Sequence, residues 1–183
     1  ASFADVTDEL LDYVMGRYRN TKGLILDIRG NGGGAGVIVN MILSRFTNEQ
    51  KIVGYEQMRN GVNHNDFSEP APVVIEPKGA FFNVPLVVLT DRGCYSAATY
   101  FALSTKSFDN ITLMGDTTGG GAGMPNGGEL PNGWTYRFST TRLLDKDKRN
   151  YAEQGVPPDV IATFNWNDLT KDEIIEQAIL RLR

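Results

Sequence analysis

The chain has 183 residues, 41% of them hydrophobic, which is enough for one sizeable core and favours a single domain. Lys and Arg number 18 against 22 Asp and Glu, so the formal net charge is −4 and no basic cluster is present. Nucleic-acid binding is therefore disfavoured, because it requires a basic patch to neutralise phosphates. No apolar run approaches the ~20 residues that span a bilayer, so we expect no membrane insertion of this chain.

Cysteine and histidine are both scarce. Cys94 is the single cysteine and His64 the single histidine. One cysteine rules out an internal disulfide and a cysteine-rich zinc site. One histidine rules out metal sites with two histidine ligands and restricts any Ser, His and Asp triad.

The first predicted unit is helix, strand, turn and helix. Apolar residues recur at four-residue steps from Val6 to Tyr18, as in an amphipathic helix, and Asp5 is placed to cap it. Leu24 to Ile28 is a short apolar run bounded by glycines, which favours a buried parallel strand. A helix from about Gly36 to Phe46 follows the glycine turn.

The middle of the chain repeats this arrangement. Lys51 to Met58 alternates weakly and is predicted as a strand, whereas Asn60 to Pro72 is polar and rich in turn formers, as surface loops are. Pro85 to Thr90 is the strongest predicted strand, and it leads through a small-residue turn into a helix from about Ser96 to Lys106. Ile111 to Met114 is predicted as the next buried strand.

The last third contains loops, a hairpin and a final helix. Gly115 to Gly128 is glycine-rich and predicted to be a loop that serves a site. Pro131 to Trp134 contains Asn-Gly and is predicted as a hairpin turn. Thr170 to Glu173 has the pattern of a capping box, so a helix should follow Thr170. Two strand, turn and helix units together imply an α/β fold with parallel βαβ crossovers.

Gly30 to Ala35 admits more than one interpretation. It fits the G-x-G-x-x-A pattern of dinucleotide sites, and Glu49 lies about twenty residues further on. Against that interpretation, Asp27 and Arg29 stand beside the turn, and Glu49 lies in a polar stretch instead of at a strand end. A tight turn without a ligand explains the pattern equally well. A third possibility is a loop that brings backbone N–H groups close to a reacting carbonyl.

Ser96 is the candidate nucleophile. A serine before a helix is most often an N-cap whose side chain accepts a hydrogen bond from the first turn. Here Gly93, Ala97 and Ala98 leave room for a substrate, and the helix N-terminus offers N–H groups to a developing oxyanion. We therefore predict half of a serine hydrolase site.

The partner that takes the serine proton is not evident from the sequence. His64 lies in a polar loop and is a weak candidate, and Lys106 would have to leave its own helix face. Glu153 precedes a glycine and two prolines that would fix the chain, so it could orient a base or a water.

Four segments in this order resemble the tail-specific, or C-terminal processing, serine peptidases and the catalytic core of their relative, the tricorn protease. Leu24 to Gly34 is similar to the Leu-Asp-x-Arg-x-Asn-x-Gly-Gly signature, and Val87 to Ala98 to the strand and nucleophile turn. Ile111 to Gly123 is similar to Val-x-Gly-x-x-Thr-x-Gly, and Glu153 to Asp159 to Glu-x-Gly-Val-x-Pro-Asp. The match covers nearly the whole chain from Phe3 onward, and the ordered set is more specific than any one motif.

This resemblance implies a crotonase-like (ClpP-type) fold and a serine-type endopeptidase that cleaves polypeptides. Ser96 would form the acyl-enzyme, and the N–H groups of Ala97 and of Gly33, or a glycine near it, would form the oxyanion hole. The resemblance implies neither a metal nor a cofactor. The tricorn-like branch also has a glutamate that matches Glu153 in its distance from the nucleophile.

The general base departs from the family pattern. In the processing peptidases it is a lysine, but Gly121 stands where that lysine is expected. In the tricorn-like branch it is a histidine upstream of the residues that match Ala1. We therefore expect residues 1–183 to be one catalytic core domain, a fragment with little or no activity, whose base and PDZ-type domain precede Ala1.

One alternative on the same fold is a catalytically silent domain that binds a peptide or a small ligand, since the family includes non-catalytic relatives. It predicts ligand affinity without turnover. The resemblance further implies a bacterial periplasmic or cell-envelope location, and it leaves the oligomeric state open.

Overall fold

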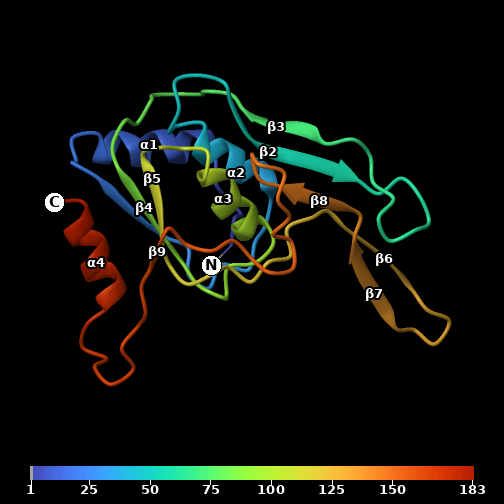
Figure 1. The fold of residues 1–183 in the computed structure, drawn as a ribbon. Helices are drawn as coiled ribbons and strands as arrows, with labels where there is room; N and C mark the ends of the chain where they lie inside the picture. The colour runs from blue at the N-terminus through green and yellow to red at the C-terminus, as the bar shows by residue number, and fades with distance from the viewer. Residues whose placement is uncertain (1) are drawn as a thin grey trace.

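The computed structural model describes residues 2–183, and within them the chain folds into a mixed α/β structure (Figure 1). A parallel sheet has the order β1-β4-β5-β9, and an antiparallel sheet has the order β3-β2-β8. The parallel strands are β1 (Leu24–Asp27), β4 (Leu86–Thr90), β5 (Ile111–Gly115) and β9 (Val160–Ile161). The antiparallel strands are β2 (Lys51–Met58), β3 (Ala71–Ile75) and β8 (Thr141–Leu144), and a separate hairpin consists of β6 (Pro125–Glu129) and β7 (Thr135–Ser139).

The predicted βαβ units are confirmed. β1 leads into α2 (Gly36–Leu43), and β4 leads into α3 (Ala97–Thr105) and then β5. β1 and β4 pair in parallel, with Leu24 opposite Leu86 and Asp27 opposite Leu89. All five residues of β4 are buried, as expected of a central strand covered on both faces. Because both strands run the same way, the turns that follow them lie at the same edge of the sheet.

Helices cover both faces of this sheet. All nine residues of α3 are buried, since the helix lies between the parallel sheet and the β2–β3–β8 sheet (Figure 1). Val88 and Leu113 face this main core together with Phe101. On the opposite face, Val87 and Leu89 pack against α4 (Glu173–Arg181). The alternation of side chains along β4 therefore divides its residues between two apolar clusters.

Two strands of the antiparallel sheet were not predicted. The polar loop ends earlier than expected, because Ala71 already begins β3, and β8 had no signal. β3 carries Pro72, which is compatible with its position as the edge strand. β2, which was predicted from its alternation, pairs with both of these strands and has a register shift between Ile52 and Gly54.

The Asn-Gly turn does join a hairpin. β6 and β7 pair from Pro125 opposite Ser139 to Glu129 opposite Thr135. The predicted loop over Gly115 to Gly128 therefore ends in strand β6. The hairpin extends away from the rest of the fold (Figure 1), and every residue of β7 is exposed.

Both predicted helix caps are wrong by two residues. The N-cap of α1 (Asp8–Tyr18) is Thr7, which accepts a hydrogen bond from the Leu10 N–H, and Asp5 lies outside the helix. The N-cap of α4 is Asp172 and not Thr170. A carboxylate at this position satisfies the free N–H groups of the first turn as well as a hydroxyl does. Within residues 2–183, no helix combines the length and the apolar character needed to cross a membrane.

Candidate active site

Ser96 lies at the junction between the β4 turn and α3, in a conformation that few side chains adopt. Its φ is 56° and its ψ is −119°, and residues other than glycine seldom have positive φ. Such a conformation costs about 1–3 kcal/mol and persists only where the surroundings impose it. Here the Ser96 N–H donates to the Gly120 carbonyl at 2.9 Å, and the Ser96 carbonyl accepts from Tyr100 at 3.0 Å.

The Ser96 side chain does not cap the helix. Although Ser96 occupies the N-cap position, its hydroxyl makes no cap hydrogen bond. The ordinary capping role considered from the sequence is therefore absent. A strained strand-to-helix turn that frees a serine hydroxyl is the arrangement in which hydrolases present a nucleophile.

The glycine turn after β1 lies directly against Ser96. A Cβ atom on Gly33, whose φ is +109°, would come 2.7 Å from Ser96 Cβ and 2.8 Å from the Tyr95 carbonyl oxygen. Only glycine fits this position. The two segments predicted to form the site from opposite halves of the chain are thus in contact.

The two expected oxyanion donors differ in their present partners. Ala97 is the first residue of α3, so its N–H has no acceptor within the helix. The Gly33 N–H donates to Asn31 Oδ1 at 2.9 Å, and Asn31 is only 4% exposed. The Asn31 carbonyl also accepts from the Tyr95 N–H at 2.9 Å. Asn31 therefore holds both turns, a role that the sequence analysis missed.

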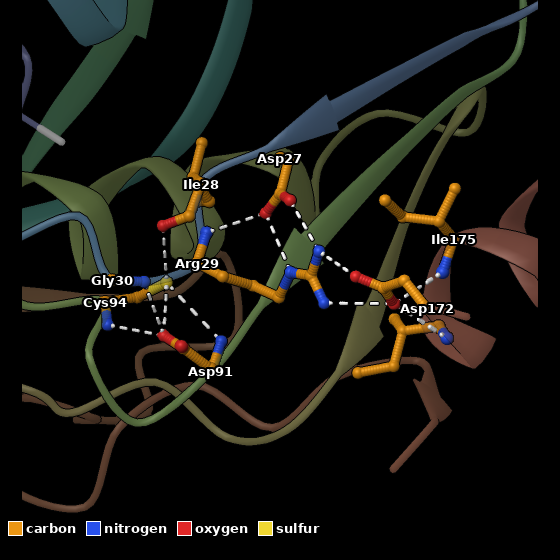
Figure 2. Close-up of polar contacts among 9 residues, drawn as sticks. Asp27, Ile28, Arg29, Gly30, Asp91, Cys94, Asp172 and Ile175 are labelled. Atoms are coloured by element: carbon orange, nitrogen blue, oxygen red, sulfur yellow. Dashed lines mark hydrogen bonds and ion pairs between the residues drawn. The ribbon is translucent and has the colours of Figure 1, made fainter. Parts of the chain in front are cut away.

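Asp91 links the same two turns from the other side. One carboxylate oxygen accepts hydrogen bonds from the N–H groups of Gly30 at 2.9 Å, Gly93 at 2.9 Å and Cys94 at 3.1 Å. The Cys94 thiol donates to the Ile28 carbonyl at 3.0 Å (Figure 2). Burial raises the pKa of Cys94 to about 12, so the thiol stays protonated at neutral pH. Asp91 could have been identified from the sequence as an acidic residue directly after a buried strand.

Arg29 anchors the glycine turn to α4. Its guanidinium forms ion pairs with Asp27 at 2.6 Å and with Asp172 at 2.7 Å (Figure 2). Asp172 also accepts from the N–H groups of Ile174 and Ile175, both at 3.1 Å. The Arg29 hydrogen bond is the largest of the effects that lower the pKa of Asp172. The Asp and Arg of the sequence signature are therefore structural supports of the turn.

These contacts argue against a dinucleotide site at Gly30 to Ala35. A pyrophosphate is bound by free N–H groups of such a turn. Here the Gly30 N–H donates to the Asp91 carboxylate, whose negative charge would repel a pyrophosphate. Glu49, the proposed ribose ligand, forms an ion pair with Lys51 at 3.7 Å.

The place expected for a lysine base is filled by an aromatic ring. A Cβ atom on Gly121 would overlap the hydroxyl-bearing end of the Tyr95 ring. A lysine at this position is thus incompatible with the present arrangement of Tyr95. Lys106, the other lysine considered, forms an ion pair with Asp159 at 2.6 Å.

The main chain of Glu153 lies close to the Ser96 turn. A Cβ atom on Gly120 would come 3.0 Å from the Glu153 carbonyl oxygen, and Gly120 accepts the Ser96 N–H. The exposed side chains of Glu153 and His64 line one cavity of about 450 Å³, together with Tyr95. The structure thus brings together two residues that the sequence analysis had considered separately.

Two further cavities have Ser96 in their walls. One, of about 300 Å³, extends between α3 and the β2–β3–β8 sheet, and we call it the inner cavity. Its walls include Tyr100, Val73 and Leu143. The other, of about 350 Å³, is open toward the base of the hairpin at Arg137. A chain passing over Ser96 could therefore place side chains on either side of the hydroxyl.

Comparison with known proteins identifies the family. Residues 1–162 match Peptidase family S41. The carboxy-terminal processing protease CtpA of Bacillus subtilis (strain 168) is 28% identical over 163 residues, which cover 88% of this chain and 33% of CtpA. The chain thus spans about a third of the length of this curated relative.

Solved structures agree with this match. A crystal structure from Parabacteroides merdae ATCC 43184, of a protein described as a peptidase, has a TM-score of 0.93 and 40% identity over 99% of this chain and 58% of its own. The tricorn protease has a TM-score of 0.62 and 24% identity over 90% of this chain and 15% of its own, a likeness of fold alone. The sequence match and the S41-like arrangement of the parallel sheet lead to one conclusion: this chain belongs to peptidase family S41, and it is similar to C-terminal processing proteases.

Proposed function

We propose that residues 1–183 form a single catalytic core domain of a serine-type endopeptidase with a crotonase-like (ClpP-type) fold. The observation that carries the proposal is the Ser96 hydroxyl, which makes no cap hydrogen bond at a strained turn between two substrate-sized cavities. Family membership supports it, because the relatives that match include processing proteases.

In the proposed reaction, the Ser96 Oγ attacks the carbonyl carbon of a peptide bond while a general base takes the hydroxyl proton. The resulting oxyanion is bound by the Ala97 N–H and the Gly33 N–H, the latter shared with or released from Asn31. The base then returns its proton to the amine nitrogen, the C–N bond breaks, and the acyl group stays on Ser96. Water, activated by the same base, hydrolyses this ester.

The general base is not a lysine at position 121, because that residue is Gly121. We propose that it is a histidine beside the cavity lined by Glu153, whose carboxylate would orient it. Phe3 supports the expectation that this histidine precedes Ala1. The Phe3 N–H donates to the Gly33 carbonyl at 2.7 Å, so this part of the chain lies beside the site. His64, which lines the same cavity, is the alternative within the chain.

The substrate and location follow from the resemblance. We propose polypeptides cleaved near their C-termini, in a bacterial periplasm or cell envelope. Cell fractionation of the source organism tests the location, and product mass spectrometry tests the cleavage position.

Hydrolysis of an internally quenched peptide mixture tests the activity, using this chain and any longer natural form of it. Ser96→Ala should abolish cleavage, whereas Ser139→Ala, which alters another serine lining the cavity that opens toward the hairpin, should not. Glu153→Gln should lower the rate by about two to three orders of magnitude if it orients the base. His64→Ala decides between the two histidines, because only a base at His64 makes that variant inactive.

The silent binding domain remains the second candidate, because no base partner of Ser96 occurs among the hydrogen bonds of residues 2–183. It predicts peptide binding that Ser96→Ala leaves unchanged, with no cleavage by any form of the protein. Retained proteolysis in Ser96→Ala would contradict the endopeptidase proposal and this alternative alike.

A further inference from the structure

The inner cavity beside Ser96 has one ionised group in its wall. Glu56, on β2, contributes to a wall that is otherwise apolar or neutral, and no Lys, Arg or His among residues 2–183 lines it. Glu56 is partly buried, and its carboxylate takes part in no hydrogen bond or ion pair recorded for the described residues. A carboxylate without a partner in a cavity wall is free to pair with a cationic group of a ligand.

The sheet register places Glu56 on the cavity face. Glu56 stands opposite Leu143 in the β2–β8 pair, and directly opposite residues of an antiparallel pair project to the same face. Val73 lies two residues from Ala71, the partner of Glu56 on β3, and therefore shares that face. Glu56, Leu143 and Val73 thus form one wall, which α2 and α3 face from the other side.

The opposite wall adds acceptors near the acid. The Tyr100 hydroxyl donates to Asn40 Oδ1 at 2.6 Å, which leaves the phenol oxygen as an acceptor. Burial of the ring is the largest effect on the pKa of Tyr100 and raises it, and the nearby charge of Glu56 acts in the same direction, so the phenol stays neutral. The polar end of the cavity therefore offers oxygen acceptors and a negative charge, and it suits a cation.

The inner cavity, of about 300 Å³, has room for a long side chain. Ser96, the N-cap of α3, and Tyr100, within α3, both line it, so the cavity extends along about one turn of this helix. Five single bonds of about 1.5 Å join Cα to Nζ in lysine, so its extended side chain reaches ~6 Å. Four methylene groups would lie against Val73 and Leu143 while the ammonium reached Glu56.

We propose that the inner cavity is the subsite for the residue whose carbonyl Ser96 attacks, and that Glu56 makes it selective for lysine or arginine. The assignment to that residue rests on the proposed peptidase function. Recognition of a basic side chain by Glu56 does not, because it requires only binding.

A binding assay on the Ser96→Ala variant tests recognition by Glu56 separately from the peptidase function. Fluorescein-labelled peptides ending in Ala-Ala-Ala-Lys, Ala-Ala-Ala-norleucine or Ala-Ala-Ala-Glu represent cleavage products, and their affinities are measured by fluorescence anisotropy. Norleucine has the lysine stem without the charge. The lysine peptide should bind about tenfold more tightly than the norleucine peptide, and the glutamate peptide most weakly.

Glu56→Gln, in the Ser96→Ala background, should bring the ratio of the lysine-peptide affinity to the norleucine-peptide affinity close to one. Glu129→Gln is the matched control, because it removes an acid from exposed β6, outside the cavity, and should leave the ratio unchanged. Thermal unfolding of both variants confirms that they are folded. Three results would overturn the inference. They are equal affinities of the lysine and norleucine peptides for Ser96→Ala, an affinity ratio that Glu56→Gln leaves unchanged, or no binding of any peptide at millimolar concentration. A lysine preference in Ser96→Ala, together with no hydrolysis by any form of the protein that retains Ser96, longer natural forms included, would instead leave Glu56 recognition intact and refute the peptidase function.

Discussion

Asp91→Ala should destabilise the protein and the site together, because one carboxylate connects the glycine turn to the Ser96 turn. The substitution removes three hydrogen bonds of 2.9, 2.9 and 3.1 Å, donated by Gly30, Gly93 and Cys94. A hydrogen bond to a charged group contributes about 1.5–3 kcal/mol. The three share a single oxygen, and water can reach the partly exposed side chain, so the full sum is not expected.

We therefore expect the free energy of unfolding to fall by about 2–4 kcal/mol. For a chain of this length, that corresponds to a decrease in Tm of about 5–15 °C. Asp91→Asn keeps an acceptor oxygen but loses its charge, so it should cost about half as much. Asp109→Ala is the control, since Asp109 is exposed and makes no hydrogen bond recorded within residues 2–183, and it should change the stability by less than ~0.5 kcal/mol.

Urea unfolding followed by circular dichroism gives these differences directly. The order Asp91→Ala, Asp91→Asn, Asp109→Ala, from most to least destabilised, supports the linkage of the two turns. If Asp91→Ala and Asp109→Ala unfold at the same urea concentration, the carboxylate does not hold the turns, and the explanation of the site geometry fails.

Three further outcomes are expected. Gly33→Ala places a methyl group 2.7 Å from Ser96 Cβ at a φ of +109°, so Ser96-dependent cleavage should fall at least a hundredfold; unchanged cleavage would contradict the close packing of the two turns. The pKa of Asp172 is lowered mainly by Arg29, so this pair stabilises the protein above the unfolded carboxyl pKa of about 3.9 and ceases to do so as the pH falls below it. Asp172→Asn should accordingly flatten the decrease in Tm below about pH 4, and a parallel curve would refute the linkage. Cys94, with its pKa raised to about 12, should react with Ellman's reagent at pH 8 only after unfolding, and rapid reaction of the native protein would contradict its burial.

Much of the fold could be predicted because its main signals are local. The runs before Gly30 and before Ser96 are apolar and bounded by glycine, so they indicated strands followed by turns. Parallel pairing then brings the two turns to one edge of the sheet, as Gly33 and Ser96 show. Ser96, Ala97 and Gly33 meet for this reason, and their catalytic roles stay predictions.

The remaining features depend on pairing between distant segments. β3 carries Pro72 on an edge, and β8 has no periodicity of its own, so neither strand has a local signature. The ring of Tyr95 over Gly121 and the Glu56 carboxylate in the inner cavity arise only when these strands assemble. The N-cap of α4 is Asp172, which also binds Arg29, a contact across 143 positions that no local pattern indicates.

The most direct test of the central claim is labelling with a fluorophosphonate probe, followed by mass spectrometry to locate the modified residue. It should be done on this chain and on any longer natural form, with Ser96→Ala and Ser139→Ala as controls. If Ser96 is the nucleophile, the label is found on Ser96 in an active form, persists in Ser139→Ala and is absent from Ser96→Ala. Proteolysis with no label on Ser96, or labelling that survives Ser96→Ala, would contradict a serine peptidase centred on this residue.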